Sequence, residues 1–242
     1  MISNKKGTKK MIIKTIFSKQ AKDMFKNPAV LIQFIIYPVV ALVFTELVAK
    51  SETFEGMDVN MFVIMMGSIF AGMGLIISTA AIIAEDIESK SLRLLVMAGV
   101  RPQQYLLGVG GFLLLAGAFT ALLFSLIGVF STEELFKFLA VMIACTATSI
   151  IIGATIGIFS KNQQAATSLG MPIAMVFGFV PMLASFNDTV YQYSSFLYTQ
   201  QLNIIVNDFS ENFSKAMLVI LANIFIVGVL FMLAYRKRGL RS

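Results

Sequence analysis

The chain has 242 residues, of which 57% are hydrophobic and only 13% are charged, and its mean hydropathy is +0.84. Soluble domains are nearer half apolar and a quarter charged, so this composition indicates a membrane protein. The chain has no His, and its one cysteine is Cys145, which excludes a zinc hydrolase, a Ser-His-Asp enzyme and an intrachain disulfide.

The first 28 residues are predicted to form a cytoplasmic tail and an amphipathic interfacial helix. Apolar residues between Met11 and Phe25 recur at helical spacing, and lysines fill the other face. Such a helix lies at a membrane surface with its lysines toward anionic headgroups. Asn27-Pro28 is expected to break it. The alternative is a basic flank that only fixes the topology.

Six apolar runs are long enough to cross a bilayer as helices, which predicts an all-α membrane protein. Together they form one transmembrane domain, 29–242, after the 1–28 segment. The short loop at 131–134 predicts that the third and fourth spans form a tight antiparallel pair. The six spans are expected at about 29–49, 59–83, 104–130, 135–159, 169–186 and 216–235.

The distribution of charge predicts the orientation of these spans. Six spans leave both termini on one side, and that side holds 16 of the 19 Lys and Arg residues. The positive-inside rule places it in the cytoplasm, which predicts a multi-pass protein of the cell membrane with both termini inside. The same distribution explains the net charge of +6 without nucleic acid as a partner.

The segment between the second and third spans has a helical pattern over residues 85–98. Asp86 and Lys90 are spaced as an i,i+4 ion pair, and Gly99 and Pro102 are expected to end the helix. Its exposed apolar stripe consists of Leu94, Leu95 and Met97. Such a stripe needs a partner or a membrane surface. The alternative is that the segment is a solvated connector.

This segment resembles the cytoplasmic stretch of type-2 ATP-binding-cassette permeases. The residues that match are two acidic positions, a leucine pair and a turn, namely Glu85, Glu88, Leu94-Leu95 and Val100-Arg101-Pro102. Lys90-Ser91 stands where that family has Gly-Thr, and Gly108 stands where it usually has Lys. The plan of an N-terminal elbow helix, six spans and both ends inside is also similar to the family.

The resemblance implies an export-type permease subunit whose 84–102 segment docks on a separate cytoplasmic ATPase. It also implies a second permease copy or a similar permease as partner, and ATP with Mg²⁺ held by the ATPase. The chain has no Gly-Lys dipeptide, so it has no phosphate loop, and we expect it to hold no catalytic residue, metal or cofactor of its own. The residues expected to couple to the partner are Glu85, Asp86, Glu88, Lys90, Arg93, Leu94, Leu95 and Arg101.

Three further points stay open at this stage. The substrate is not indicated, and a non-transport immunity, assembly or sensory protein without an ATPase is the alternative function. The pairs Gly153-x-x-x-Gly157 and Ser68-x-x-x-Gly72 allow close helix packing, either within one subunit or between subunits. The outer segment 187–215 could be a pair of short re-entrant helices or an aromatic interfacial belt.

Overall fold

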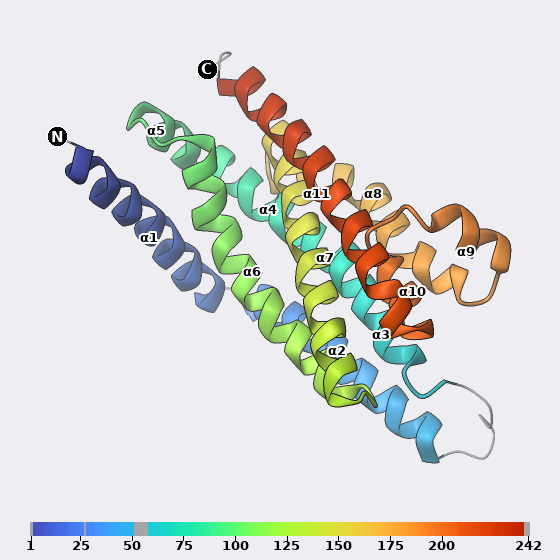
Figure 1. Ribbon diagram of the computed structural model, residues 1–242. Coiled ribbons are helices and arrows are strands. Elements are labelled where there is room, and N and C mark those ends of the chain that lie inside the picture. The colour runs from blue at the N-terminus through green and yellow to red at the C-terminus, as the bar shows by residue number, and fades with distance from the viewer. Residues whose placement is uncertain (1, 27, 51–57, 240–242) are drawn as a thin grey trace.

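The computed structural model describes residues 2–26, 28–50 and 58–239, and within these ranges the chain is helical, without a strand. The predicted all-α class is therefore confirmed, and the predicted breaker Asn27 lies outside the described residues. The helices, drawn in Figure 1, are α1 (Ile2–Lys26), α2 (Pro28–Lys50), α3 (Met61–Ile69), η2 (Phe70–Gly74), α4 (Leu75–Glu88), α5 (Ser91–Met97), α6 (Pro102–Ile127), α7 (Thr132–Phe159), α8 (Gln163–Ala184), α9 (Asp188–Ser194), α10 (Gln201–Asn207) and α11 (Phe209–Gly239).

Six helical stretches of the described chain are long and apolar enough to cross a membrane, as predicted. They are α2, the continuous α3-η2-α4 unit, α6, α7, α8 and α11. Two begin six or seven residues before the predicted start, because polar caps extend a helix beyond its apolar part. The Asn162 side chain accepts the Ala165 N–H at 2.8 Å before α8, and Asp208 accepts the Ser210 and Glu211 N–H groups before α11.

The α3-η2-α4 unit is the centre of the bundle. Its membrane span is 72% buried, whereas that of α11 is only 17% buried. On one side, a Cβ added to Gly153 would lie 2.5 Å from the Ile76 carbonyl oxygen, and Gly157 approaches Ala80 in the same way. The glycine pair therefore serves packing of α7 on α4 within one chain.

On its other side the unit crosses α8 with almost no space between the backbones. A Cβ on Gly72 would lie 2.4 Å from the Phe177 carbonyl carbon. Gly72 belongs to η2, a single π-helical turn in the middle of the span. Such turns often mark functional sites in helices. The Ser68-x-x-x-Gly72 pair thus also serves packing within the chain.

The N-terminal helix α1 packs along the first half of α6 through part of its apolar face. Ile16 is buried there, and Phe17 makes an edge-to-face contact with Phe112 at 5.4 Å between ring centroids. A Cβ on Gly108 would lie 2.6 Å from Ile16 Cγ2, so a larger residue there would push α1 away. This face therefore meets protein as well as the surroundings, while the lipid contact of the lysine face stays a prediction.

The outer segment holds a pair of short helices, α9 and α10, joined by turns. The Tyr198 side chain between them is fully buried against α7, with its hydroxyl 2.8 Å from Ser149 Oγ. The Cys145 thiol donates to the Tyr198 carbonyl oxygen at 3.2 Å. The segment thus contains two short helices, and the turn that connects them is part of the core. That these helices re-enter the membrane, or that the exposed Tyr193 and Phe196 form an aromatic belt, stays a prediction.

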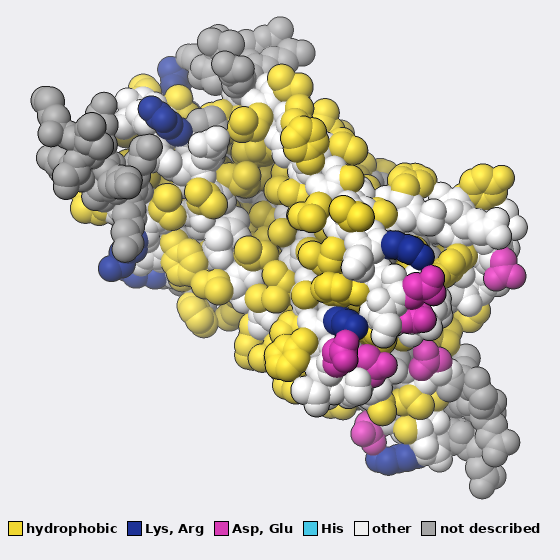
Figure 2. All heavy atoms as spheres, viewed as in Figure 1, with side chains coloured by type: hydrophobic (Ala, Val, Ile, Leu, Met, Phe, Trp, Pro, Cys, Tyr) yellow, Lys and Arg dark blue, Asp and Glu magenta, His cyan; other side chains and the backbone are white. Residues whose placement is uncertain are grey.

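The two ends of the bundle differ in charge. The start of α1, the end of α11 and α5 lie together at one end, at the upper left of Figure 1. In Figure 2 the middle of this face is apolar, and the Asp and Glu side chains gather at the opposite, lower right end. At that opposite end Lys50, Lys137 and Lys215 each pair with a glutamate four residues earlier.

Candidate functional site

The segment between the second and third spans contains two helices rather than the predicted single helix over 85–98. Helix α4 continues from the membrane to Glu88, and α5 begins at Ser91. Lys90 separates them in the left-handed region, with φ of 59°. The prediction of one continuous helix is wrong, because a residue in the left-handed conformation cannot continue an α-helix. The predicted stop at Gly99 is confirmed, since its φ is +79°, and Pro102 is the first residue of α6.

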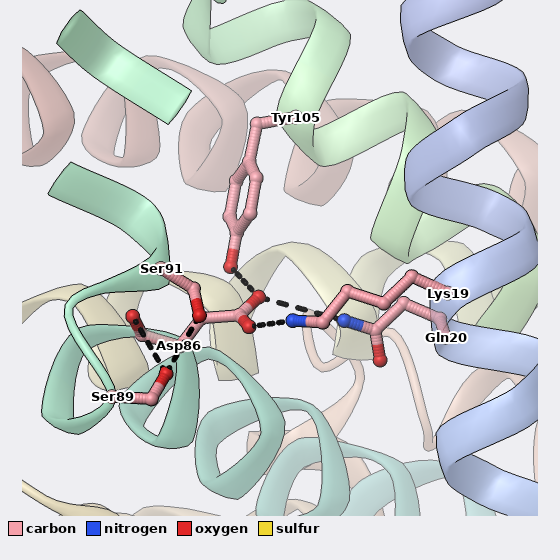
Figure 3. A network of polar contacts seen from close by, with 6 residues as sticks. All are labelled: Lys19, Gln20, Asp86, Ser89, Ser91 and Tyr105. Atoms are coloured by element: carbon pink, nitrogen blue, oxygen red, sulfur yellow. Dashed lines mark hydrogen bonds and ion pairs between the residues drawn. The ribbon is translucent and has the colours of Figure 1, made fainter. Parts of the chain in front are cut away.

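Asp86 lies at the centre of a buried polar network that joins three helices (Figure 3). Its side chain is 5% exposed and forms an ion pair with Lys19 of α1. Its Oδ2 accepts the Tyr105 hydroxyl of α6 at 2.7 Å and the Gln20 side-chain N–H of α1 at 3.5 Å. Among the described residues its ionic partner is Lys19, so the predicted pair with Lys90 is wrong.

The two glutamates of the motif have different surroundings. Glu88 Oε2 accepts the backbone N–H of Gln163 at 3.3 Å, which ties the end of α4 to the start of α8. A carboxylate at this position also complements the positive end of the α8 dipole. Glu85 is exposed and borders a cavity beside α1 and α8.

Helix α5 separates the remaining predicted residues into an outward and an inward set. Lys90 and Arg93 are exposed, as is Leu94, whose exposed fraction is 63%. Leu95 instead is half-buried and packs against the core, together with Leu92 and Val96. Arg101 is exposed at the start of α6, where its backbone N–H donates to Gln104 Oε1 at 2.9 Å. Met97, outside the predicted set, is 66% exposed beside Leu94.

A cavity of about 880 Å³ opens beside this segment, bounded by α1, α2, α4 and α8. Its innermost polar side chains are Gln33 and Ser78, which hydrogen-bond to each other inside otherwise apolar spans. Its outer part is bordered by Asp23, Glu85 and Gln163. A cavity with a charged mouth and a mixed polar and apolar wall can hold an amphiphilic molecule.

Residues 11–199 match the protein-family model of the ABC-2 type transporters. The chain belongs to this family. It is a transmembrane permease subunit of an ABC transporter, as the sequence predicted. No curated protein sequence matches the chain.

Three residues of this ABC-2 permease that matter at the site escaped the sequence analysis. Lys19 belongs to the lysine face of the predicted interfacial helix, Gln20 was not singled out, and Tyr105 falls within the predicted span 104–130. The available signal was Asp86 itself, because a carboxylate at the end of a membrane span requires partners. Nothing in the local spacing indicates which lysine or hydroxyl those partners are.

Proposed function

We propose that the protein is the permease subunit of an ATP-driven exporter, with ATP and Mg²⁺ bound by a separate cytoplasmic ATPase subunit that docks on α5. One observation carries this proposal: α5 has no buried residue, and it exposes Leu94 and Met97, three residues apart, at the end of the bundle where α1 begins and α11 ends. An exposed apolar pair beside Lys90 and Arg93 fits a groove of a partner protein.

The connections of α5 provide a route for movement. It follows α4 directly, and the end of α4 is held to α1 and α6 through Asp86 and to α8 through Glu88. A push on α5 therefore acts on the most buried span of the bundle rather than on a loose loop. The tight crossing at Gly72 makes α8 follow that span. ATP-driven closure of the partner would switch the permease between two such arrangements.

Two further features support export from the cytoplasm. The basic end, with α5 and both termini, is the cytoplasmic end by the positive-inside rule. Glu85, Ser89 and Ser91 border the large cavity beside α5, at this same end, where an exporter loads its substrate. We propose a second copy of the chain, or a similar permease, as the other half of the translocation path.

The test is to purify the permease with its co-purifying ATPase and measure ATP hydrolysis in nanodiscs. We expect Leu94→Asp to lose the ATPase partner, because a carboxylate would enter an apolar groove. Val129→Asp is the matched control, since Val129 is an exposed apolar residue at the opposite end of the bundle. If Leu94→Asp retains a stoichiometric, fully active ATPase, α5 is not the docking surface.

A further inference from the structure

We propose that the cavity between α1, α4 and α8 is a binding site for lipophilic cations, and that such amphiphiles are the class of substrate transported. The assignment of these cations as substrates rests on the proposed function, whereas the binding itself does not. The argument depends on the charges that line the cavity, on its depth and on the apolar part of its wall.

The lining carries an excess of negative charge at an otherwise basic end of the protein. Its ionic side chains are Asp23, Glu85 and Asp86 against one cation, Lys19, and that lysine is paired with Asp86. Asp23 also borders a second, shallower cavity on α1 together with Lys14 and Lys22. Glu85 is therefore the carboxylate best placed to act on a ligand in the main cavity.

The dipole of α4 adds to the negative potential of the cavity. The carboxyl end of α4 lies at the cavity, and this end of the helix dipole carries a partial negative charge. The opposing amino end of α8 is already complemented by Glu88, which accepts the Gln163 N–H. A cation at the mouth is thus favoured by both the side chain of Glu85 and the α4 terminus, whereas an anion is repelled by both.

The cavity is deep enough for the apolar part of an amphiphile. Ser78 and Glu85 both line it and lie seven residues apart on α4, which corresponds to about 10 Å along the helix. Met24, Ile77 and Ile82 give the wall between them its apolar surface. An apolar body can therefore lie along α4 while its charged group stays near Glu85.

A third cavity, at the opposite end of the pair formed by α3-η2-α4 and α8, is also lined by negative charge. It holds about 440 Å³ between α3, α8 and α9, and both of its charged lining residues are carboxylates, Asp58 and Asp188. This cavity and the main cavity beside Glu85 lie on opposite sides of the Gly72 crossing, one toward each end of the bundle. A cation thus meets negative charge at both ends of the α3-η2-α4 and α8 pair.

The experiment measures binding to the purified permease in nanodiscs without any ATPase, by equilibrium dialysis corrected with empty nanodiscs. The probes are tetraphenylphosphonium and tetraphenylborate, which have nearly the same size and shape but opposite charge. We expect saturable binding of the cation, and an affinity about tenfold lower in Glu85→Gln, a loss of about 1.4 kcal/mol. Tetraphenylborate should not bind more weakly to Glu85→Gln than to the wild type.

Two variants make the result specific. Glu133→Gln removes the same charge from an exposed glutamate at the opposite end and should leave cation binding unchanged. Ala81→Phe places a large side chain in the wall of the cavity and should weaken binding of the cation. Equal affinity of wild type and Glu85→Gln, or equal losses in Glu85→Gln and Glu133→Gln, would overturn the proposal. If the cation binds but no ATPase co-purifies with the permease from its membranes, this site stands and the proposed export function is refuted.

Discussion

The network around Asp86 allows a prediction of how firmly α1 is held to the transmembrane bundle. Asp86→Ala removes the acceptor of the Tyr105 hydroxyl and the counter-ion of Lys19 in one step. Asp86→Asn removes only the charge, because the amide oxygen can still accept from Tyr105. Comparing the two variants separates the hydrogen bond from the ion pair.

The expected magnitudes follow from the burial of each partner. Tyr105 is fully buried, and an unpaired buried donor costs about 1–3 kcal/mol. The Lys19 side chain is 44% exposed, so its ion pair contributes roughly 0–1 kcal/mol. Together these contributions are about 1–4 kcal/mol, and at about 2–4 °C per kcal/mol for a chain of this size Asp86→Ala should lower the melting temperature by about 2–16 °C. Asp86→Asn should lower it by less than about 4 °C.

The single cysteine provides the assay. Cys145 is fully buried, so a thiol-reactive fluorogenic dye labels the protein only as it unfolds. Heating wild type and variants in the same detergent with this dye gives the melting temperatures directly. Tyr105→Phe, which keeps the Asp86–Lys19 pair, is a further check and should cost about 1 kcal/mol.

The ranking of the variants is the decisive result. If Asp86→Asn melts as low as Asp86→Ala, the charge and not the Tyr105 hydrogen bond stabilises the junction, and the reasoning is refuted. The same conclusion follows if Tyr105→Phe melts with the wild type.

Three more predictions concern melting temperatures, and the first two use the same dye assay. Gly72→Ala puts a methyl group 2.4 Å from the Phe177 carbonyl carbon and should cost about 1–3 kcal/mol, whereas Gly111→Ala, with no atom within 4 Å, should stabilise by up to about 1 kcal/mol. Lys90→Gly relieves a left-handed residue and should stabilise by roughly 1 kcal/mol, so a lower melting temperature would contradict that backbone assignment. The backbone N–H groups of Glu211 and Ser210 hold the pKa of Asp208 below its ordinary value, so its cap stabilises α11 at neutral pH and is lost as the pH falls through the lowered pKa. The difference in melting temperature between wild type and Asp208→Asn should therefore disappear in strong acid, where far-UV circular dichroism replaces the dye because a protonated thiol does not react with it.

Local sequence was sufficient to find the spans, and less so to find their ends. Hydropathy marks the apolar part of a helix, so all six spans were found. The helices that start early, α8 and α11, do so because Asn162 and Asp208 cap them, and a single polar side chain changes hydropathy very little. The helix over 85–98 was wrong for a related reason, since periodicity does not register one left-handed residue such as Lys90.

The sequence by itself thus determined that this is a six-span, all-helical permease with a charged segment at one end, because the cost of placing polar backbone and charges in a bilayer is read residue by residue. Only the tertiary structure decided what each residue of that segment does. Asp86 faces inward because Lys19, 67 positions earlier, and Tyr105 converge on it, while Leu94 faces outward because nothing in the described chain covers it. The cavity beside Glu85 likewise exists only where four helices meet. Burial and pairing depend on contacts between distant segments, and local periodicity carries no information about those.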